Sequence, residues 1–158
     1  MMIRLRKKRD KDFIIECMSS EVYKKYFSFL GEIQNINFKR RKIYIIQNEK
    51  EKVGFIEYYH WDKCNSNISV NILALKTGFI IGKALLNSAY IAFEKFKVHK
   101  LIIKVHEENI HMGKILRKLK IPLEGKLKMI DGNNSFFYIY LYGLLKNEYL
   151  TIKENINK

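Results

Sequence analysis

The stretch from Leu73 to Leu86, LALKTGFIIGKALL, places two glycines between an apolar run and an apolar helical pattern. Glycines at a strand-to-helix turn let the backbone approach a ligand closely. The free N–H groups of the first helical turn then bind phosphate, helped by the helix dipole. Gly78, Gly82 and the neighbouring Lys83 therefore predict a phosphate or pyrophosphate site, although two glycines near a helix start also suit a turn without a ligand.

The segment HEENIH holds two histidines and two carboxylates, which are common metal ligands. His106 and His111 are five positions apart, so on a helix their side chains would diverge by about 140°. A zinc-protease helix places its two histidines four positions apart, on one face. Because the chain has only Cys17 and Cys64 besides, the sequence predicts neither a metal site nor a disulfide framework.

The formal net charge is +14, and the basic residues are mostly Lys, spread along the whole chain. This excess favours anionic partners. Nucleic-acid-binding proteins usually concentrate Arg and aromatic side chains, so we do not expect a dedicated nucleic-acid role. The charged start MMIRLRKKRDKD is not a signal peptide, and polar residues interrupt the longest apolar run. We therefore expect a cytoplasmic protein without a membrane span.

Hydrophobic periodicity and turn residues predict one domain of mixed α/β (α+β) class over residues 1–158. The expected order is β-α-α-β-β-β-α-β-α-β-β, a mostly antiparallel, twisted sheet with one central β-α-β crossover. Strands are expected at Ile3–Arg6, Ile43–Gln47, Val53–Trp61, Ile68–Leu75, Leu101–Val105, Leu123–Ile130 and Phe136–Leu145. Helices are expected after Asp10, from Ser20 to Gly31, from Gly82 to Phe96 and from Asn109 to Leu119, before a polar tail at 146–158 that frays at its end.

From Leu73 to Leu145 the chain resembles the GNAT superfamily of N-acetyltransferases, whose element order is the one given above. The family's acyl-CoA loop typically reads Arg/Gln-x-x-Gly-x-Gly/Ala. Here Thr77, Ile80 and Gly82 occupy its three key places, and only the last one matches. Asn109 matches the family's asparagine, the LEGKL segment matches the strand after the next helix, and DGNNSFFYIYLYGLLKNEY is similar to the last hairpin.

The resemblance implies that acetyl-CoA is a co-substrate, bound by residues 68–121 without a metal. In the family two strands splay apart. A backbone N–H near Leu73 or Ala74 would polarise the thioester carbonyl. The N–H groups from Gly78 to Ala84 would hold the pyrophosphate. Lys114 would reach the phosphoadenosine end. The cofactor-binding residues expected on this basis are Leu73, Ala74, Leu75, Gly78, Ile80, Ile81, Gly82, Lys83, Ala84, Asn109 and Lys114.

The family commonly places a tyrosine on the helix after the asparagine, as general acid for the departing thiolate, and Leu116 stands there in this chain. A thiol with a pKa of about 8.5 leaves without full protonation, so the change lowers activity without abolishing it. A degenerate, non-catalytic module that binds CoA or nucleic acid is therefore one alternative to an enzyme.

An attacking amine must be neutral, so a base assists. Glu57 is the first candidate, because a carboxylate interrupts an otherwise apolar strand. His60 is the second candidate. Strand side chains alternate, so the two are expected on opposite faces unless a bulge intervenes. The alternative interpretation of Glu57 is a solvated residue on an open sheet face.

In the family the first strand and the two helices after it, here residues 1–38, cover the acceptor together with the following loop. That loop carries Arg40 and Arg41, which suit a diphosphate. The nearest branches are the aminosugar N-acetyltransferases of the pseudaminic-acid pathway and the Rim-type acetyltransferases. These branches imply that the acceptor is a primary amine of a small molecule, with a nucleotide-linked aminosugar as the first candidate. The alternative acceptor is a protein N-terminus. The protein is expected to be a monomer or a homodimer.

Overall fold

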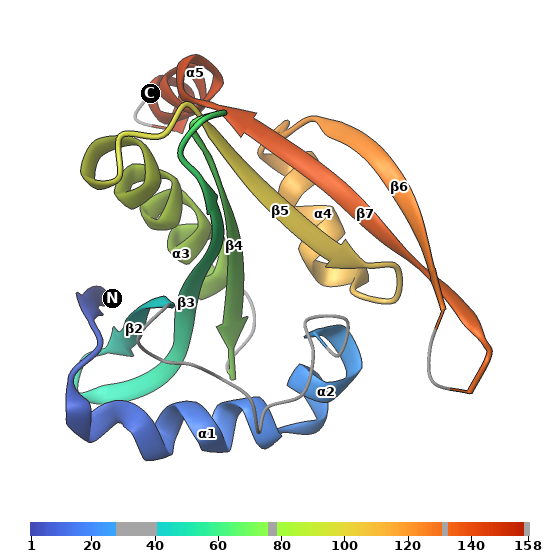
Figure 1. Cartoon of the computed structure of the whole chain (residues 1–158). Helices are drawn as coiled ribbons and strands as arrows, with labels where there is room; N and C mark the ends of the chain where they lie inside the picture. Colours follow the sequence, from blue (N-terminus) through green and yellow to red (C-terminus); the bar gives the residue numbers. More distant parts are fainter. Residues whose placement is uncertain (28–40, 76–78, 131–132, 157–158) are drawn as a thin grey trace. The chain divides into compact units, whose positions relative to one another are not determined.

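The computed structural model of the chain describes residues 1–27, 41–75, 79–130 and 133–156 (Figure 1). Its strands form one seven-stranded sheet in the order β1-β2-β3-β4-β5-β7-β6. The strands are β1 (Met2–Leu5), β2 (Lys42–Asn48), β3 (Glu51–Asp62), β4 (Asn67–Ala74), β5 (Lys100–His106), β6 (Leu123–Ile130) and β7 (Phe136–Leu145). The helices are α1 (Lys11–Ser19), α2 (Glu21–Phe27), α3 (Phe79–Tyr90), α4 (Ile110–Lys118) and α5 (Lys146–Ile156). The predicted mixed, mostly antiparallel sheet is confirmed.

The chain divides into two compact units, one of residues 1–60 and 70–90 and the other of residues 61–69 and 91–158. In the first unit β1 pairs antiparallel with β2, and β2 with β3. The register sets Ile43 opposite Glu57 and Ile45 opposite Phe55, so these four side chains share one face of the sheet. A single domain over the whole length, with its expected subdivision, stays a prediction.

Helices α1 and α2 cover this face of the first unit with an apolar core. A strand face with isoleucine and phenylalanine at alternate positions buries them against the apolar side of an amphipathic helix. Tyr23 and Phe27 of α2 stack with their ring centroids 5.1 Å apart. The buried residues of this core are Ile14, Cys17, Met18, Tyr23, Phe27, Ile43, Ile45, Phe55 and Leu73.

The opposite face of the same strands packs against α3. Tyr44 and Tyr58, which alternate with the residues of the first face, meet edge to face at 5.8 Å. The Tyr58 hydroxyl donates a hydrogen bond to the carbonyl oxygen of Ser88 in α3, at 2.7 Å. The three strands therefore carry α1 and α2 on one side and α3 on the other.

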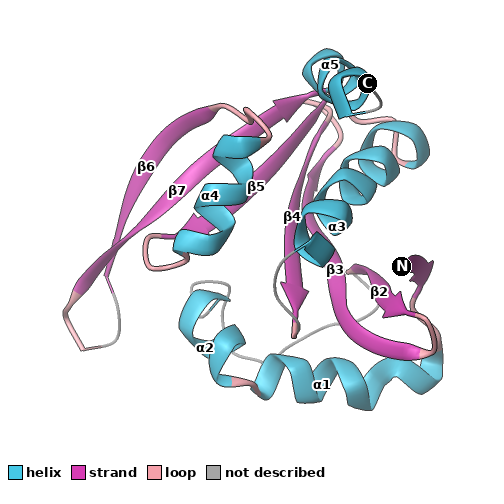
Figure 2. Ribbon diagram, turned by 180° about the vertical axis from the view of Figure 1, so that it is seen from behind, coloured by secondary structure: helices cyan, strands magenta, loops and turns pink. Residues whose placement is uncertain are grey.

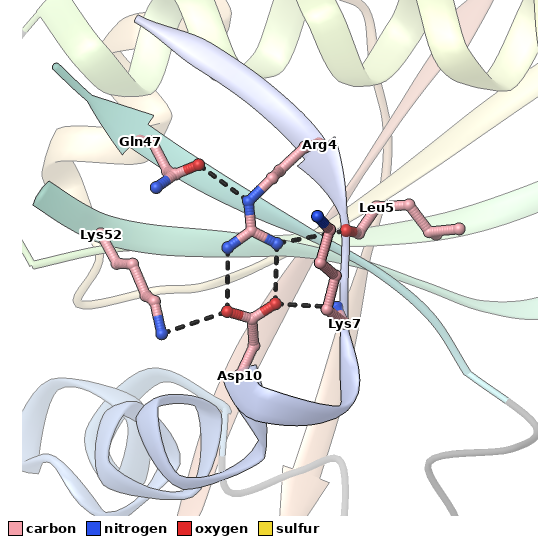
Figure 3. Close-up of polar contacts among 6 residues, drawn as sticks. All are labelled: Arg4, Leu5, Lys7, Asp10, Gln47 and Lys52. Carbon is pink, nitrogen blue, oxygen red and sulfur yellow. Dashed lines mark hydrogen bonds and ion pairs between the residues drawn. The ribbon is translucent and has the colours of Figure 1, made fainter. Parts of the chain in front are cut away.

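Asp10 precedes α1, as the sequence predicts, but its side chain makes no cap hydrogen bond to the helix. Its buried carboxylate instead accepts two hydrogen bonds from Arg4, at 2.7 and 2.9 Å, and one from the backbone N–H of Lys7, at 2.7 Å (Figure 3). The Lys52 Nζ of β3 lies 3.1 Å from Oδ1, the carboxylate oxygen that the Lys7 N–H does not contact. These partners hold the pKa of Asp10 well below its usual range, Arg4 having the largest effect. The carboxylate thus ties β1, β3 and the start of α1 together.

In the second unit β7 lies between β5 and β6 and pairs antiparallel with both. Helix α4 packs across one face of β5 and β7 (Figure 2), where a Cβ added at Gly113 would lie 4.0 Å from the hydroxyl of Tyr142. The Asn109 side chain caps α4 by accepting a hydrogen bond from the N–H of Met112, at 3.2 Å. The predicted capped helix is therefore confirmed.

The C-terminal segment differs from its prediction as a polar, fraying tail. Residues Lys146–Ile156 form α5, and Tyr149 is buried with its ring centroid 5.4 Å from that of Phe93. Lys146 lies 3.1 Å from Glu94, and the backbone N–H of Leu145 donates to the Glu148 carboxylate at 2.8 Å. One buried ring and two polar contacts thus fix a helix whose other residues are mostly exposed.

The two cysteines lie in different surroundings. Cys17 of α1 belongs to the apolar core of the first unit, and burial raises the pKa of its thiol to about 11. Cys64 is exposed in the turn between β3 and β4. None of the described helices is long and apolar enough to cross a membrane.

Candidate functional site

Glu57 of β3 is fully buried. The strand carries it on the face covered by α1 and α2, opposite Ile43 of β2. The interpretation of Glu57 as a solvated residue on an open face is therefore wrong. An ionised carboxylate removed from water needs partners, because an unpaired buried charge is costly.

Two side chains supply those partners. The Arg41 guanidinium donates to one Glu57 oxygen at 2.6 Å, and the Asn71 side-chain N–H donates to the other oxygen at 3.2 Å. The predicted base and the predicted anion-binding arginine thus form one ion pair. The other predicted arginine, Arg40, lies outside the described residues.

Tyr23 of α2 completes the group, because its hydroxyl lies close enough to Arg41 and Glu57 for both to affect its pKa. Burial, together with the nearby charge of Glu57, raises the pKa of Tyr23 to about 12, so the hydroxyl stays protonated at neutral pH. Burial opposes the charge of Arg41, but Glu57 outweighs it and raises the pKa of the guanidinium. We call Tyr23, Arg41, Glu57 and Asn71 the Glu57 cluster. Sequence reasoning missed Tyr23 and Asn71, although an asparagine inside the apolar run ISVNILA was a visible signal.

His60 is exposed and has a positive backbone φ of 47°, which is uncommon outside glycine. The regular alternation of β3 therefore ends there. Its role as the second candidate base stays a prediction.

The end of β4 holds the predicted thioester-polarising N–H groups. The Leu75 N–H donates to the Val53 carbonyl oxygen at 2.8 Å, so it is already used within the sheet. N–H groups two residues apart on a strand point to the same side, so the Leu73 N–H is also directed at β3. Among Leu73, Ala74 and Leu75, Ala74 is the residue whose N–H is directed away from β3.

Helix α3 begins at Phe79, three residues before the predicted start at Gly82. The first N–H groups of a helix lack intrahelical partners, and in α3 these include the N–H groups of Phe79, Ile80 and Ile81. Ile80 and Ile81 therefore fit the prediction of a phosphate-binding turn, whereas the N–H groups of Gly82, Lys83 and Ala84 bond within the helix. Gly78 lies outside the described residues.

Gly82 faces open space, because a Cβ added there meets no atom within 4 Å. Lys83 is exposed beside it, whereas Ala84 is fully buried. The first turn of α3 thus offers backbone donors, room and a nearby cation. The side chain of Ala84 is excluded from the predicted site.

Three predicted positions lie in the second unit. Asn109 is half-buried, and its side-chain oxygen is used in capping α4. Lys114 is exposed on the same helix, whereas Leu116 is fully buried and belongs to the core. The contribution of Asn109 and Lys114 to cofactor binding stays a prediction. Over the described part of the chain, no three His, Cys, Asp or Glu side chains are grouped as metal ligands.

Solved structures of known proteins match nearly the whole chain. The spermidine N-acetyltransferase of Vibrio cholerae in complex with CoA and spermine superposes with a TM-score of 0.80, at 14% identity, over 94% of this chain and 97% of that one. A chimeric form of that enzyme gives a TM-score of 0.79 at 16% identity, over 94% and 97%. The chain has the N-acetyltransferase fold. The fold predicted from the resemblance is thereby confirmed, whereas the aminosugar and Rim-type branches stay predictions.

No protein-family model matches the chain. Nucleolar protein 12 of Kluyveromyces lactis is 31% identical over 98 residues, which are 61% of this chain and 20% of that protein. The chain thus spans about a fifth of the length of this curated relative.

Proposed function

We propose that the protein is an acetyl-CoA-dependent N-acetyltransferase that acetylates a primary amine of a small molecule. The observation that carries the proposal is the N-acetyltransferase fold, which covers 94% of the chain and is shared with an enzyme solved with CoA and spermine. Within that fold, β3 carries a buried carboxylate, and the first turn of α3, whose leading N–H groups have no intrahelical partner, lies beside open space at Gly82.

The residues of the first unit fit acetyl-CoA as co-substrate. The N–H groups of Ile80 and Ile81 would bind the pyrophosphate, with the open space at Gly82 and the side chain of Lys83 beside them. The Ala74 N–H, which β3 does not use, would donate to the thioester carbonyl oxygen and stabilise the negative charge that develops on it.

The reaction is a direct acyl transfer in a ternary complex. The amine nitrogen attacks the thioester carbon, the new C–N bond forms, and the C–S bond breaks to release the CoA thiolate. The proton lost by the amine goes to Glu57, the buried carboxylate of β3. Because Leu116 supplies no acid, the thiolate leaves unprotonated and takes its proton from water.

For the acceptor, the formal charge of +14 favours an anionic molecule, and a nucleotide-linked aminosugar is the finer form of the proposal. Arg41 is a less favourable ligand for the diphosphate of such a molecule, because its guanidinium already donates a hydrogen bond to Glu57. A polyamine is the second candidate, since the similar enzyme was solved with spermine. A protein N-terminus is the third.

The test is a panel of acceptors with the full chain. Calorimetry is expected to show one acetyl-CoA site of micromolar affinity. Mass spectrometry then follows acetylation of nucleotide-linked aminosugars, polyamines and N-terminal peptides. Failure to bind acetyl-CoA at millimolar concentration contradicts the proposed function, and transfer to peptides alone replaces the small-molecule acceptor by a protein N-terminus.

The role of Glu57 is tested by Glu57→Gln, which is expected to lower turnover by about 10²- to 10⁴-fold. The loss should be largest at low pH, where fewer acceptor amines are already neutral. A turnover and pH profile equal to those of the wild type would assign the base to another residue or to water.

A further inference from the structure

Asn71 is a buried member of the Glu57 cluster to which the proposed function gives no role. It lies on β4, on the same face as Leu73, and is 3% exposed. A buried amide has four hydrogen-bonding positions to satisfy, two donors on nitrogen and two lone pairs on oxygen. Such a group is normally fully engaged, and an exception needs an explanation.

The orientation of the Asn71 amide is fixed by its neighbour. Its nitrogen faces a Glu57 carboxylate oxygen at 3.2 Å and donates to it. Turning the amide over would set two acceptor oxygens against each other, so only this orientation is favourable. The amide oxygen, Oδ1, therefore points elsewhere, and no donor among the described residues reaches it.

The charge around this oxygen is balanced. Arg41 neutralises Glu57 at 2.6 Å, and the Tyr23 hydroxyl remains protonated. A buried cluster with no net charge and an open acceptor suits a neutral N–H donor better than an ammonium ion, which would have to be desolvated without a counter-charge. The neutral form of an amine is also the form that attacks a thioester.

We propose that Asn71 Oδ1 accepts a hydrogen bond from the acceptor amine and holds its nitrogen beside Glu57. This inference rests on the proposed function and names a substrate-binding residue for it. A neutral primary amine has two N–H groups and one lone pair. One N–H donates to Asn71 and the other faces the Glu57 carboxylate, so the lone pair is directed away from both and toward the thioester carbon. The proton that then leaves the nitrogen passes to Glu57.

The matched variants are Asn71→Leu, which keeps the size but removes the acceptor oxygen, and Ile72→Val, which perturbs the next position of β4 on the opposite face. With saturating acetyl-CoA, Asn71→Leu is expected to lower kcat/KM for the amine by about 10- to 100-fold, the effect of one buried hydrogen bond. Affinity for acetyl-CoA should stay unchanged in both variants. Ile72→Val should keep the amine kcat/KM within about twofold.

An amine kcat/KM for folded Asn71→Leu within about twofold of the wild type overturns the inference. If this variant does not fold, the wild type decides: with amide nitrogens labelled, saturation with the amine that is acetylated must shift the Asn71 side-chain resonance, and an unmoved resonance also overturns the inference. If no amine of the panel is acetylated, the proposed function fails separately. The same amines are then titrated alone, and a shift at Asn71 supports the amine site whereas no shift contradicts it.

Discussion

Removal of Arg41 is expected to cost the protein more stability than removal of the charge of Glu57, although the two form a single ion pair. Glu57 is fully buried, whereas the Arg41 side chain is 24% exposed. In Arg41→Gln the carboxylate keeps its charge but stays out of contact with solvent. In Glu57→Gln the guanidinium can turn toward solvent, and the new amide still offers an oxygen to the Asn71 N–H.

The magnitudes follow from that difference. An uncompensated buried charge costs about 3–5 kcal/mol, so Arg41→Gln is expected to lower the free energy of unfolding by that amount. Glu57→Gln loses a charge-assisted hydrogen bond without stranding a charge, which costs about 1–2 kcal/mol. The double variant should recover about 2 kcal/mol relative to Arg41→Gln, because the isolated carboxylate is gone.

Urea unfolding of the wild type, the two single variants and the double variant at pH 7 measures these terms as a double-mutant cycle. The denaturant slope must stay constant for the comparison to hold. Two results would refute the reasoning. One is a loss in Glu57→Gln that equals or exceeds the loss in Arg41→Gln, and the other is strict additivity of the two changes.

Three further predictions concern the frame around the site. Gly54→Ala should severely destabilise the fold, since its Cβ would collide with the backbone of Leu73 and Ala74, and a loss under about 1 kcal/mol in urea unfolding would contradict this close approach of β3 and β4. Gly82→Asp should abolish acetyl-CoA binding by placing a carboxylate at the phosphate-binding turn, whereas the control Gly82→Ala, which meets no atom within 4 Å, should bind in calorimetry and be slightly more stable. Asp10→Asn should cost about 3 kcal/mol at neutral pH. Because the folded pKa of Asp10 is lowered, this difference is fully present above the ordinary carboxyl pKa and should shrink below about pH 4, so a difference that persists unchanged to pH 2 would refute it.

Much of the fold could be predicted because its signals are local. The limits of β6 and β7 agree with the predicted Leu123–Ile130 and Phe136–Leu145, where alternation is strong and a turn sequence separates the two runs. The sequence pattern predicts the start of α3 three residues late, because Gly82 resembles a helix boundary although the apolar residues before it already belong to the helix. Helix α5 was missed, since its stability depends on the contact of Tyr149 with Phe93, far away in the sequence.

The candidate site was predictable in its residue types but not in its pairing. Glu57 was recognised because it interrupts an apolar strand, yet its ion pair with Arg41 spans 16 positions and depends on the register between β2 and β3. The role of Asn71 could not be predicted for the same reason. Its partner Glu57 lies on another strand, and the sequence does not specify which residues of two strands face each other. That the Ala74 N–H is directed away from β3 likewise follows from the hydrogen bond between Leu75 and Val53, which no sequence pattern specifies.

The contrast between the two thiols gives the protein a built-in chemical probe. A thiol reagent at neutral pH should modify Cys64 at once, whereas Cys17, enclosed by the core of α1 and with its pKa raised to about 11, reacts only when that core opens. With Cys64 replaced by serine, the labelling rate of Cys17 therefore measures how often α1 leaves the sheet face that holds Glu57. Comparing that rate with and without an acceptor amine reports whether the ligand holds α1 against this face.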